Sequence, residues 1–343
     1  MLRITHYIFL TMTGLALTAC LSSSDCFRED VFCAALVTDT LGMEDHGINQ
    51  DAWAGMLEAQ ENGLADRVDY IESVDSRDYE KNIVYFASRG YDAIFTAGIG
   101  LRNATFEVAT QYFAAQTQGS PSPIFIGFNQ SYEESRPNLV SIIFPEDQMG
   151  FAAGVVATQL TKTGTVGAIC ETSGIDSMWR YCEGFRAGVE FADGTVKAAV
   201  IYRDDGDREK LFLDEAWGYE TGSSLIQRGA DVIFAAGGVT GQGALRAALE
   251  FDVFAIGAER DQAAALGGTG PGLVTSFYGD ARFEVQEAIR RAKNGEFSGE
   301  RVGKIHFSVP HPGVDPSSIT GLEALISLLS KGEIVPNVTK EKP

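Results

Sequence analysis

The stretch at residues 34–53 carries the polar side chains that are best placed to do chemistry. Residues 34–37 are a short apolar run with the length of a buried parallel strand, and Asp39 follows in a Gly-containing loop. A helical pattern begins next to Asn49. Ligands in open α/β sheets lie at the carboxyl ends of strands, so both side chains are placed to contact one. Without a neighbouring base or nucleophile they can bind hydroxyls and ring nitrogens but cannot relay protons.

The same stretch resembles the opening segment of the basic membrane protein family. The matching pattern is TD-x-x-G-x-x-D-x-x-x-NQ-x-AW, read here as Thr38, Asp39, Gly42, Asp45, Asn49, Gln50, Ala52 and Trp53. Members of that family are lipoprotein substrate-binding subunits of ABC importers, and several bind purine nucleosides. The resemblance implies that Asp39, Asn49 and Gln50 contact the ligand. Asp45 stands before a helix start and is expected to cap that helix instead.

A second segment of the same resemblance lies at residues 252–262. In the family this strand ends in G-x-D-x-D-Q, and its first acid is associated with the sugar hydroxyls of a nucleoside. Here that position is Glu259, one methylene longer, while Asp261 and Gln262 fit the pattern. A carboxylate that faces vicinal hydroxyls accepts two charge-assisted hydrogen bonds. The alternative is a pair of solvated acids after a strand, and two matched segments so far apart argue against it.

Two departures from the family pattern concern the ligand. The family usually has an aromatic residue just before the Asn-Gln pair, where this chain has Ile48, and a Lys after the Thr-Ser of residues 275–280, where this chain has none. A missing aromatic removes stacking worth about 0.5 to 1.5 kcal/mol. Trp179, and Tyr278 on a strand expected to return to the first lobe, are candidate replacements. Each is equally compatible with an ordinary core or interlobe aromatic.

The N-terminus has the pattern of an export signal. Residues 1–19 combine Arg3, an apolar core and small residues before Cys20, and they are too short for a membrane-spanning helix. Residues 17–20 resemble a bacterial lipobox, which implies that Cys20 carries lipid. Residues 20–32 are then a lipidated tether, and the protein is anchored to a membrane without spanning it.

Four cysteines remain after Cys20. An even number in an exported chain indicates disulfides, most simply Cys26 with Cys33 and Cys170 with Cys182, although three pairings are possible. Four buried free thiols are the alternative. No zinc spacing such as C-x-x-C appears.

Composition excludes nucleic acid as a partner. The 343 residues carry a formal charge of -20, so a polyanion would be repelled. The N-terminus has no helix-turn-helix pattern, which argues against a sugar-responsive repressor. The hydrophobic content of 45% is sufficient for two lobes with cores of their own.

Strand and helix patterns alternate along the chain, which predicts an α/β fold with parallel sheets and helices on both faces. A helix rich in small residues at 150–157 is the expected crossing, and the pattern restarts with a strand at 165–170. We therefore expect two Rossmann-like lobes around a cleft, the architecture of a type I periplasmic binding protein. The expected first lobe covers residues 33–142 and 270–303, and the second covers residues 143–269 and 304–335. Several crossings between them suit hinge closure over a ligand.

Glycines end the corresponding strands of the two lobes. Gly98 follows the strand at 91–97, and Gly238 follows the strand at 230–236. The G-x-G at 98–100 lacks the third glycine of a dinucleotide fingerprint, so we interpret these glycines as room for a ligand or a tight turn. The scattered histidines support neither a metal site nor a Ser-His-Asp triad.

These patterns predict a lipid-anchored receptor that binds a small polar ligand, a purine nucleoside by resemblance, and delivers it to an ABC permease. It is expected to be a monomer at the extracytoplasmic face of a bacterial membrane, without cofactor, metal or enzyme activity. A signalling receptor and a binder of a non-nucleoside solute remain alternatives. An exported nucleoside-cleaving enzyme would need clustered carboxylates at the first strand end, and the single Asp39 argues against it.

Overall fold

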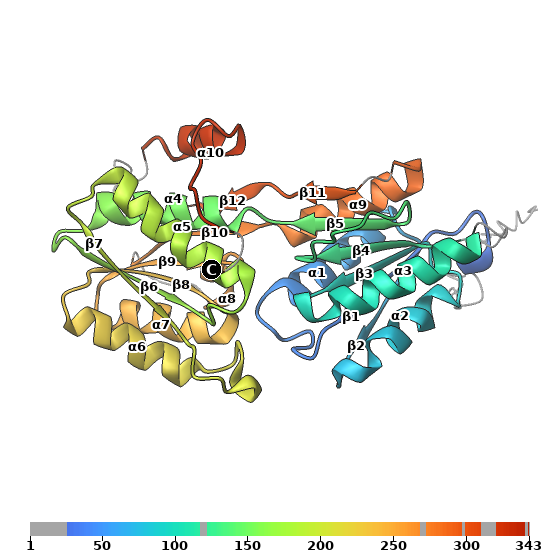
Figure 1. Cartoon of the computed structure of the whole chain (residues 1–343), viewed down its shortest axis with the longest axis horizontal. Helices are drawn as coiled ribbons and strands as arrows, with labels where there is room; N and C mark the ends of the chain where they lie inside the picture. Colours follow the sequence, from blue (N-terminus) through green and yellow to red (C-terminus); the bar gives the residue numbers. More distant parts are fainter. Residues whose placement is uncertain are drawn as a thin grey trace, which may run out of the picture.

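The protein consists of two α/β lobes side by side along its long axis (Figure 1). The computed structural model describes residues 26–116, 122–267, 272–296, 299–309, 320–339 and 342. The expected signal peptide and the lipidation site Cys20 lie outside the described residues. Within the described residues, no helix combines the length and the apolarity needed to cross a membrane.

The first lobe is built on a six-stranded parallel sheet with the order β11-β5-β4-β3-β1-β2. Its strands are β1 (Cys33–Thr38), β2 (Arg67–Glu72), β3 (Ala93–Ala97), β4 (Ile124–Phe128), β5 (Leu139–Ile143) and β11 (Glu300–Val302). Its helices are α1 (Ile48–Glu61), α2 (Tyr79–Ala87), α3 (Arg102–Gln116) and α9 (Ala281–Asn294), with short 3-10 turns at Ser76–Asp78 and Ile99–Leu101. Successive β1 side chains enter separate cores, Leu36 in one and Val37 in the other, because helices bury both faces of the sheet.

The second lobe repeats this plan with the order β12-β10-β9-β8-β6-β7, and among these described strands only β12 is antiparallel to its neighbour. Its strands are β6 (Thr165–Cys170), β7 (Lys197–Tyr202), β8 (Val232–Ala236), β9 (Phe254–Ala258), β10 (Leu273–Gly279) and β12 (Ile305–Phe307). Its helices are α4 (Glu146–Leu160), α5 (Asp176–Ala192), α6 (Glu215–Gln227), α7 (Gly238–Glu250), α8 (Gln262–Ala265) and α10 (Leu322–Ser330), with a 3-10 turn at Arg208–Lys210. The predicted fold class is confirmed.

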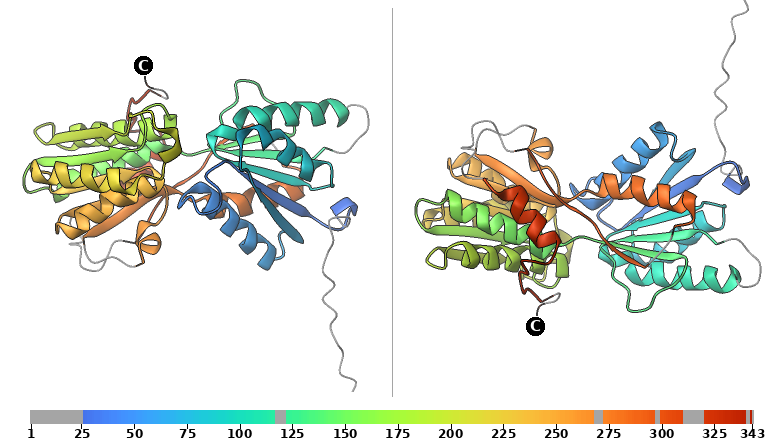
Figure 2. Two further views of the ribbon diagram at one scale, coloured as in Figure 1. Left: turned by 90° about the horizontal axis from the view of Figure 1, so that it is seen from below. Right: turned by 90° about the horizontal axis from the view of Figure 1, so that it is seen from above.

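Among the described residues, three connections join the lobes: β5 to α4, β10 to α9, and β11 to β12 (Figure 2). The prediction of several crossings is therefore confirmed. Small residues fix the helix that follows the first crossing. A side chain at Gly150 or Gly154 of α4 would collide with the backbone of α5. This close packing holds the N-terminal end of α5 beside the crossing.

The prediction placed residues 270–303 in the first lobe, and for the strand at 273–279 this prediction is wrong. This strand pairs in parallel with β9 and extends the second sheet, because its residues Leu273 and Phe277 are buried in the cores of that lobe. The chain crosses only after Gly279. Tyr278 therefore lies on a second-lobe strand.

The predicted tether is also shorter than residues 20–32. Cys26 and Val31 are buried in a core of the first lobe, and the backbone N–H of Phe32 donates to the carboxylate of Asp66, so residues 26–32 are part of that lobe.

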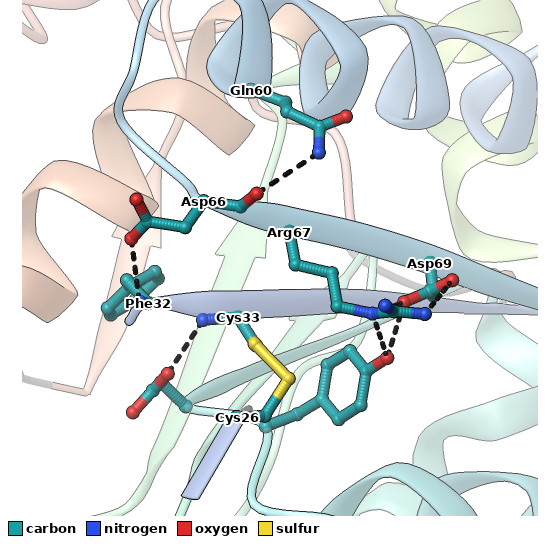
Figure 3. The surroundings of a disulfide bond; sticks show 9 residues. Cys26, Phe32, Cys33, Gln60, Asp66, Arg67 and Asp69 are labelled. Carbon is teal, nitrogen blue, oxygen red and sulfur yellow. Dashed lines mark hydrogen bonds and ion pairs between the residues drawn. A yellow bond between two sulfur atoms is a disulfide. The ribbon is translucent and has the colours of Figure 1, made fainter. Parts of the chain in front are cut away.

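The described part of each lobe contains one disulfide. Cys26 is bonded to Cys33 and Cys170 to Cys182, the simplest of the pairings that the sequence allows. The first disulfide ties the N-terminal turn to the start of β1 (Figure 3). The second joins the last residue of β6 to α5, at the opposite end of its sheet.

Candidate ligand-binding site

A cavity of about 180 Å³ lies between the lobes at the carboxyl ends of their strands. From the first lobe it receives residues that follow β1, β3, β4 and β5. From the second lobe it receives residues that follow β6, β7, β8 and β9, together with Gly279 at the end of β10. Pockets for drug-sized molecules are usually larger, so this cavity suits one small solute.

Asp39 forms the first-lobe side of this cavity. Its Oδ1 accepts hydrogen bonds from the side-chain Nδ2 of Asn49 at 3.0 Å and from the backbone N–H of Leu41 at 3.1 Å. Gly98 leaves the space for the same carboxylate, because its φ is 102° and a Cβ there would collide with Asp39 Oδ2. Burial raises the pKa of Asp39, while the bond from Asn49 lowers it.

Asp45 organises the start of α1. Its carboxylate accepts the backbone N–H groups of Gly47 and Asn49 at 2.9 Å and of Gln50 at 3.2 Å, so the predicted capping role is confirmed. Burial nevertheless raises the pKa of Asp45 to about 7, although these N–H groups favour its charged form. Asp45 also lines the cavity.

Glu259 forms the matching wall in the second lobe. Its Oε2 accepts the backbone N–H groups of Gly237 at 2.7 Å and Gly238 at 2.8 Å, at the start of α7. Burial raises the pKa of Glu259, while these two bonds lower it. Glu259 has a φ of 70°, a strained conformation for a non-glycine residue that recurs at functional sites.

Glu146 and Arg180 form an ion pair at the hinge side of the cavity. Arg180 Nη1 also donates to the carbonyl oxygen of Phe144 at 3.3 Å. Burial raises the pKa of Glu146 to about 7, and the charge of Arg180 opposes that rise. The described cavity lining contains six carboxyl groups and two guanidinium groups, which makes it acidic: Asp39, Asp45, Asp51, Glu146, Asp176 and Glu259, with Arg102 and Arg180.

The rest of the wall is mainly apolar: Leu41, Ile48, Ile99, Ile143, Phe144, Ile175, Met178, Tyr181 and Phe212. Phe212 lies on the loop after β7. Arg203 organises that loop, since its Nε donates to Glu171 at 2.5 Å and its Nη2 donates to the carbonyl oxygen of Asp207 at 2.9 Å. Arg203 and Glu171 are both buried, so this ion pair is shielded from solvent.

Asn129 supplies an acceptor without a partner. It follows β4 with a φ of 53°, and its backbone N–H donates to the carbonyl oxygen of Ile142 at 2.8 Å. Its side-chain Oδ1 is buried and has no hydrogen-bond partner among the described residues. A buried acceptor in a cavity wall is a position where a ligand donor would be favourable.

Four of the nine predicted ligand-binding residues line the cavity, namely Asp39, Gly98, Gly238 and Glu259. The other five lie outside the lining, namely Asn49, Gln50, Trp179, Asp261 and Tyr278.

Two of these five belong to α1 and support its end of the site. Asn49 is fully buried, and its Nδ2 donates hydrogen bonds to Asp39 Oδ1 and, at 2.9 Å, to the carbonyl oxygen of Gly42. Gln50 accepts a hydrogen bond from Arg260 of the other lobe. Both therefore support the site through neighbouring residues without lining the cavity.

The remaining three make local contacts in the second lobe. Asp261 caps α8 by accepting the N–H of Ala263 at 3.0 Å. Trp179 stacks on Tyr202, and Tyr278 stacks on His306. The structure does not bring either candidate aromatic to the cavity.

Sequence reasoning missed Asp51, Asn129, Glu146, Arg180 and Phe212. Asn129 and Glu146 follow buried strands closely, so the signal that identified Asp39 could have found them. Asp51 lies in the first turn of α1 and Arg180 lies farther along α5, so neither carries such a signal. The expectation of a single acid at the first strand end is also wrong, because Asp45 and Asp51 line the cavity beside Asp39.

These extra acids are committed to structural contacts. Asp45 binds backbone N–H groups, and Asp51 lies 3.2 Å from Arg260 and 3.6 Å from Arg282. In the part of the chain that the structure describes, no three His, Cys, Asp or Glu side chains are grouped as metal ligands. The arrangement offers acceptors and donors to a bound solute.

Two similar α/β lobes that enclose a small cavity have the architecture of the periplasmic binding proteins. Solved structures share this fold. A solute-binding protein of an ABC transporter system from Aeropyrum pernix K1 matches with a TM-score of 0.72 and 19% identity, over 89% of this chain and 92% of that chain. A transcriptional activator of the comK gene from Bacillus halodurans matches with a TM-score of 0.70 and 21% identity, over 89% of this chain and 100% of that one.

Residues 32–306 match the family model described as Bmp, ABC transporter substrate-binding protein PnrA-like, and the chain belongs to that family. The resemblance seen in the sequence is therefore confirmed. A CD4+ T-cell-stimulating antigen of Listeria monocytogenes is 32% identical, over 84% of this chain and 82% of its own length. The ABC transporter nucleoside-binding protein BmpA of Lactococcus lactis subsp. cremoris is 25% identical, over 82% of this chain and 80% of its own length.

Proposed function

We propose that this ABC transporter substrate-binding protein captures a neutral, hydroxyl-bearing solute, a purine nucleoside, between its lobes. The observation that carries the proposal is the pairing of Asp39 and Glu259 across one cavity, each at the end of a buried strand. Two carboxylates on opposite walls can accept hydrogen bonds from hydroxyl groups at both ends of a small solute. The name of the Lactococcus relative, a nucleoside-binding protein, agrees with this ligand class.

The other walls suit a flat, partly apolar group. Phe144 at the β5–α4 crossing, Phe212 of the second lobe and Ile48 of the first lobe all line the cavity. They supply apolar contact at a site where the family's aromatic residue is absent. Asn129 Oδ1 could accept a hydrogen bond from a ring N–H or an amino group.

The charge of the cavity favours the nucleoside over its phosphorylated forms. Carboxyl groups outnumber guanidinium groups in the lining, and Arg180 is already paired with Glu146. A phosphate group would meet acids in a poorly screened environment, where like charges repel strongly. We therefore expect nucleoside monophosphates to be rejected.

The protein acts on its ligand by binding and closure, without enzyme activity. It reaches the membrane as a monomer held by a lipid on Cys20, and it passes its ligand to an ABC permease at the extracytoplasmic face. Replacing Cys20 by Ser should move the protein from the membrane fraction to the soluble fraction. A variant that stays in the membrane fraction would contradict the anchor.

Calorimetry on ligand-free protein tests the proposed ligand. Wild-type protein, unfolded and refolded to remove bound solute, should bind inosine and fail to bind inosine monophosphate. Asp39→Asn should weaken inosine binding, whereas Asp261→Asn should bind like wild type because residue 261 lies outside the cavity and Asn still caps a helix. Equal binding of both ligands, or release of free base from inosine, would contradict the proposal.

A further inference from the structure

Arg260 crosses from the second lobe to the first. It follows Glu259 directly, and only 9% of its surface is exposed. Glu259 stays with its own lobe by binding Gly237 and Gly238. The guanidinium of Arg260 instead reaches α1 of the first lobe, where Nη1 donates to Gln50 Oε1 and Nη2 lies 3.2 Å from Asp51 Oδ1.

Asp51 also forms an ion pair with a second guanidinium, which belongs to its own lobe. Arg282 at the start of α9 lies 3.6 Å from Asp51 and 3.7 Å from Glu58. The Arg282 side chain is 47% exposed and that of Arg260 is 11% exposed. Lobe opening would separate Asp51 from Arg260 and leave its contact with Arg282 intact.

The charges that line the cavity give Arg260 a role in closure. Asp39, Asp45 and Asp51 come from the first lobe, and Glu146, Asp176 and Glu259 come from the second. Closing an empty cleft therefore brings acids toward acids, which Coulomb repulsion opposes. Arg260 places a positive charge across the same gap and makes two hydrogen-bonding contacts there.

We propose that Arg260 is a positioning residue that, with Gln50 and Asp51, forms an interlobe latch and holds the empty cleft partly closed. Open and closed states of such proteins differ by a small free energy, so one polar contact between lobes can shift their populations. Apparent affinity falls in proportion to the fraction of protein in the binding-competent state. The latch therefore sets how tightly the cleft holds its ligand, and this last point rests on the proposed function.

Small-angle X-ray scattering of the ligand-free protein tests the latch without any ligand. Arg260→Gln should increase the radius of gyration relative to that of wild type. Arg282→Gln is the matched control, because it removes a guanidinium from the same carboxylate within one lobe, and it should scatter like wild type. Asp51→Asn should open the lobes as Arg260→Gln does, and it replaces that variant if Arg260→Gln fails to fold.

Unchanged scattering of folded Arg260→Gln would overturn the latch, and so would equal opening in Arg282→Gln. Inosine binding supplies a second readout. We expect the dissociation constant for inosine to be about tenfold larger in Arg260→Gln and unchanged in Arg282→Gln. If wild type does not bind inosine, the nucleoside proposal fails, and the scattering result still decides the latch.

Discussion

The two walls of the cleft both place a carboxylate beside a glycine at the end of a buried strand, yet they hold it in different ways. Asp39 is held by the side chain of Asn49 and by a backbone N–H within its own loop. Glu259 is held by two N–H groups at the start of α7. The first arrangement depends on side chains, and the second depends on the position of a helix.

This difference shows that similar strand ends can be supported by different neighbours. In the first lobe, the disulfide lies at the start of β1, away from the cavity, and Asp45 fixes the loop. In the second lobe, the disulfide includes Cys182, next to Tyr181 of the lining, and the ion pair of Arg203 with Glu171 supports the loop that carries Phe212. We therefore expect the second wall to be more sensitive to structural mutations.

The largest effect should come from Arg203→Ala. It leaves Glu171 buried without its partner, and breaking a buried ion pair costs about 3 to 5 kcal/mol. Chemical denaturation should show this loss. Arg186→Ala is the control, because Arg186 makes an exposed pair with Glu183 and should cost less than about 1 kcal/mol. Equal losses of unfolding free energy in Arg203→Ala and Arg186→Ala would contradict the larger role of the buried ion pair.

The disulfides should separate stability from binding. Removing either one, by Cys26→Ala with Cys33→Ala or by Cys170→Ala with Cys182→Ala, should cost about 2 to 3 kcal/mol of stability because the loops closed are of similar length. Only the second pair should also weaken ligand binding, since Tyr181 and Arg180 next to Cys182 line the cavity. Weaker ligand binding after removal of the Cys26–Cys33 disulfide would contradict its position away from the cavity.

Both acids should contribute to affinity. Asp39→Ala and Glu259→Ala should each weaken binding by about 1.5 to 3 kcal/mol, the usual range for hydrogen bonds to charged groups. Glu259→Ala should also lower the thermal unfolding temperature more than Asp39→Ala, because it leaves two N–H groups of α7 without their acceptor. Calorimetry and thermal denaturation measure the two effects. Unchanged affinity in both variants would remove these residues from the site.

A separate effect concerns pH and Asp45. Its pKa is raised from 3.8 to about 7, so the folded state binds a proton more tightly than the unfolded state. The stability from this group is complete below pH 4 and is lost as the pH rises to about 7. Relative to wild type, Asp45→Asn should therefore gain stability over that range, which denaturation at pH 4, 5.5 and 7 would show. Parallel pH profiles would contradict the raised pKa.

Strand ends could be predicted from the sequence, and contacts between lobes could not. Asp39, Gly98, Gly238 and Glu259 each follow an apolar run, and all four line the cavity. Gln50 was matched to a motif, but its neighbour in space is Arg260, which lies 210 residues away in the chain. No local pattern specifies such a pair.

The same limit explains the errors in the fold. The residues of β10 read as a buried strand, but which sheet they join depends on pairing with β9. Trp179 and Tyr278 have the side chains that stacking on a ligand needs, yet Tyr202 and His306 already occupy their faces. Composition and spacing predict what a side chain can do, and packing decides what it contacts.

A crystal structure of the protein purified with the solute that it captures in cells would test the central claim most directly. The account predicts one small hydroxyl-bearing molecule between the lobes, hydrogen-bonded to both Asp39 and Glu259. A solute bound to one lobe only, or bound away from these two carboxylates, would contradict it.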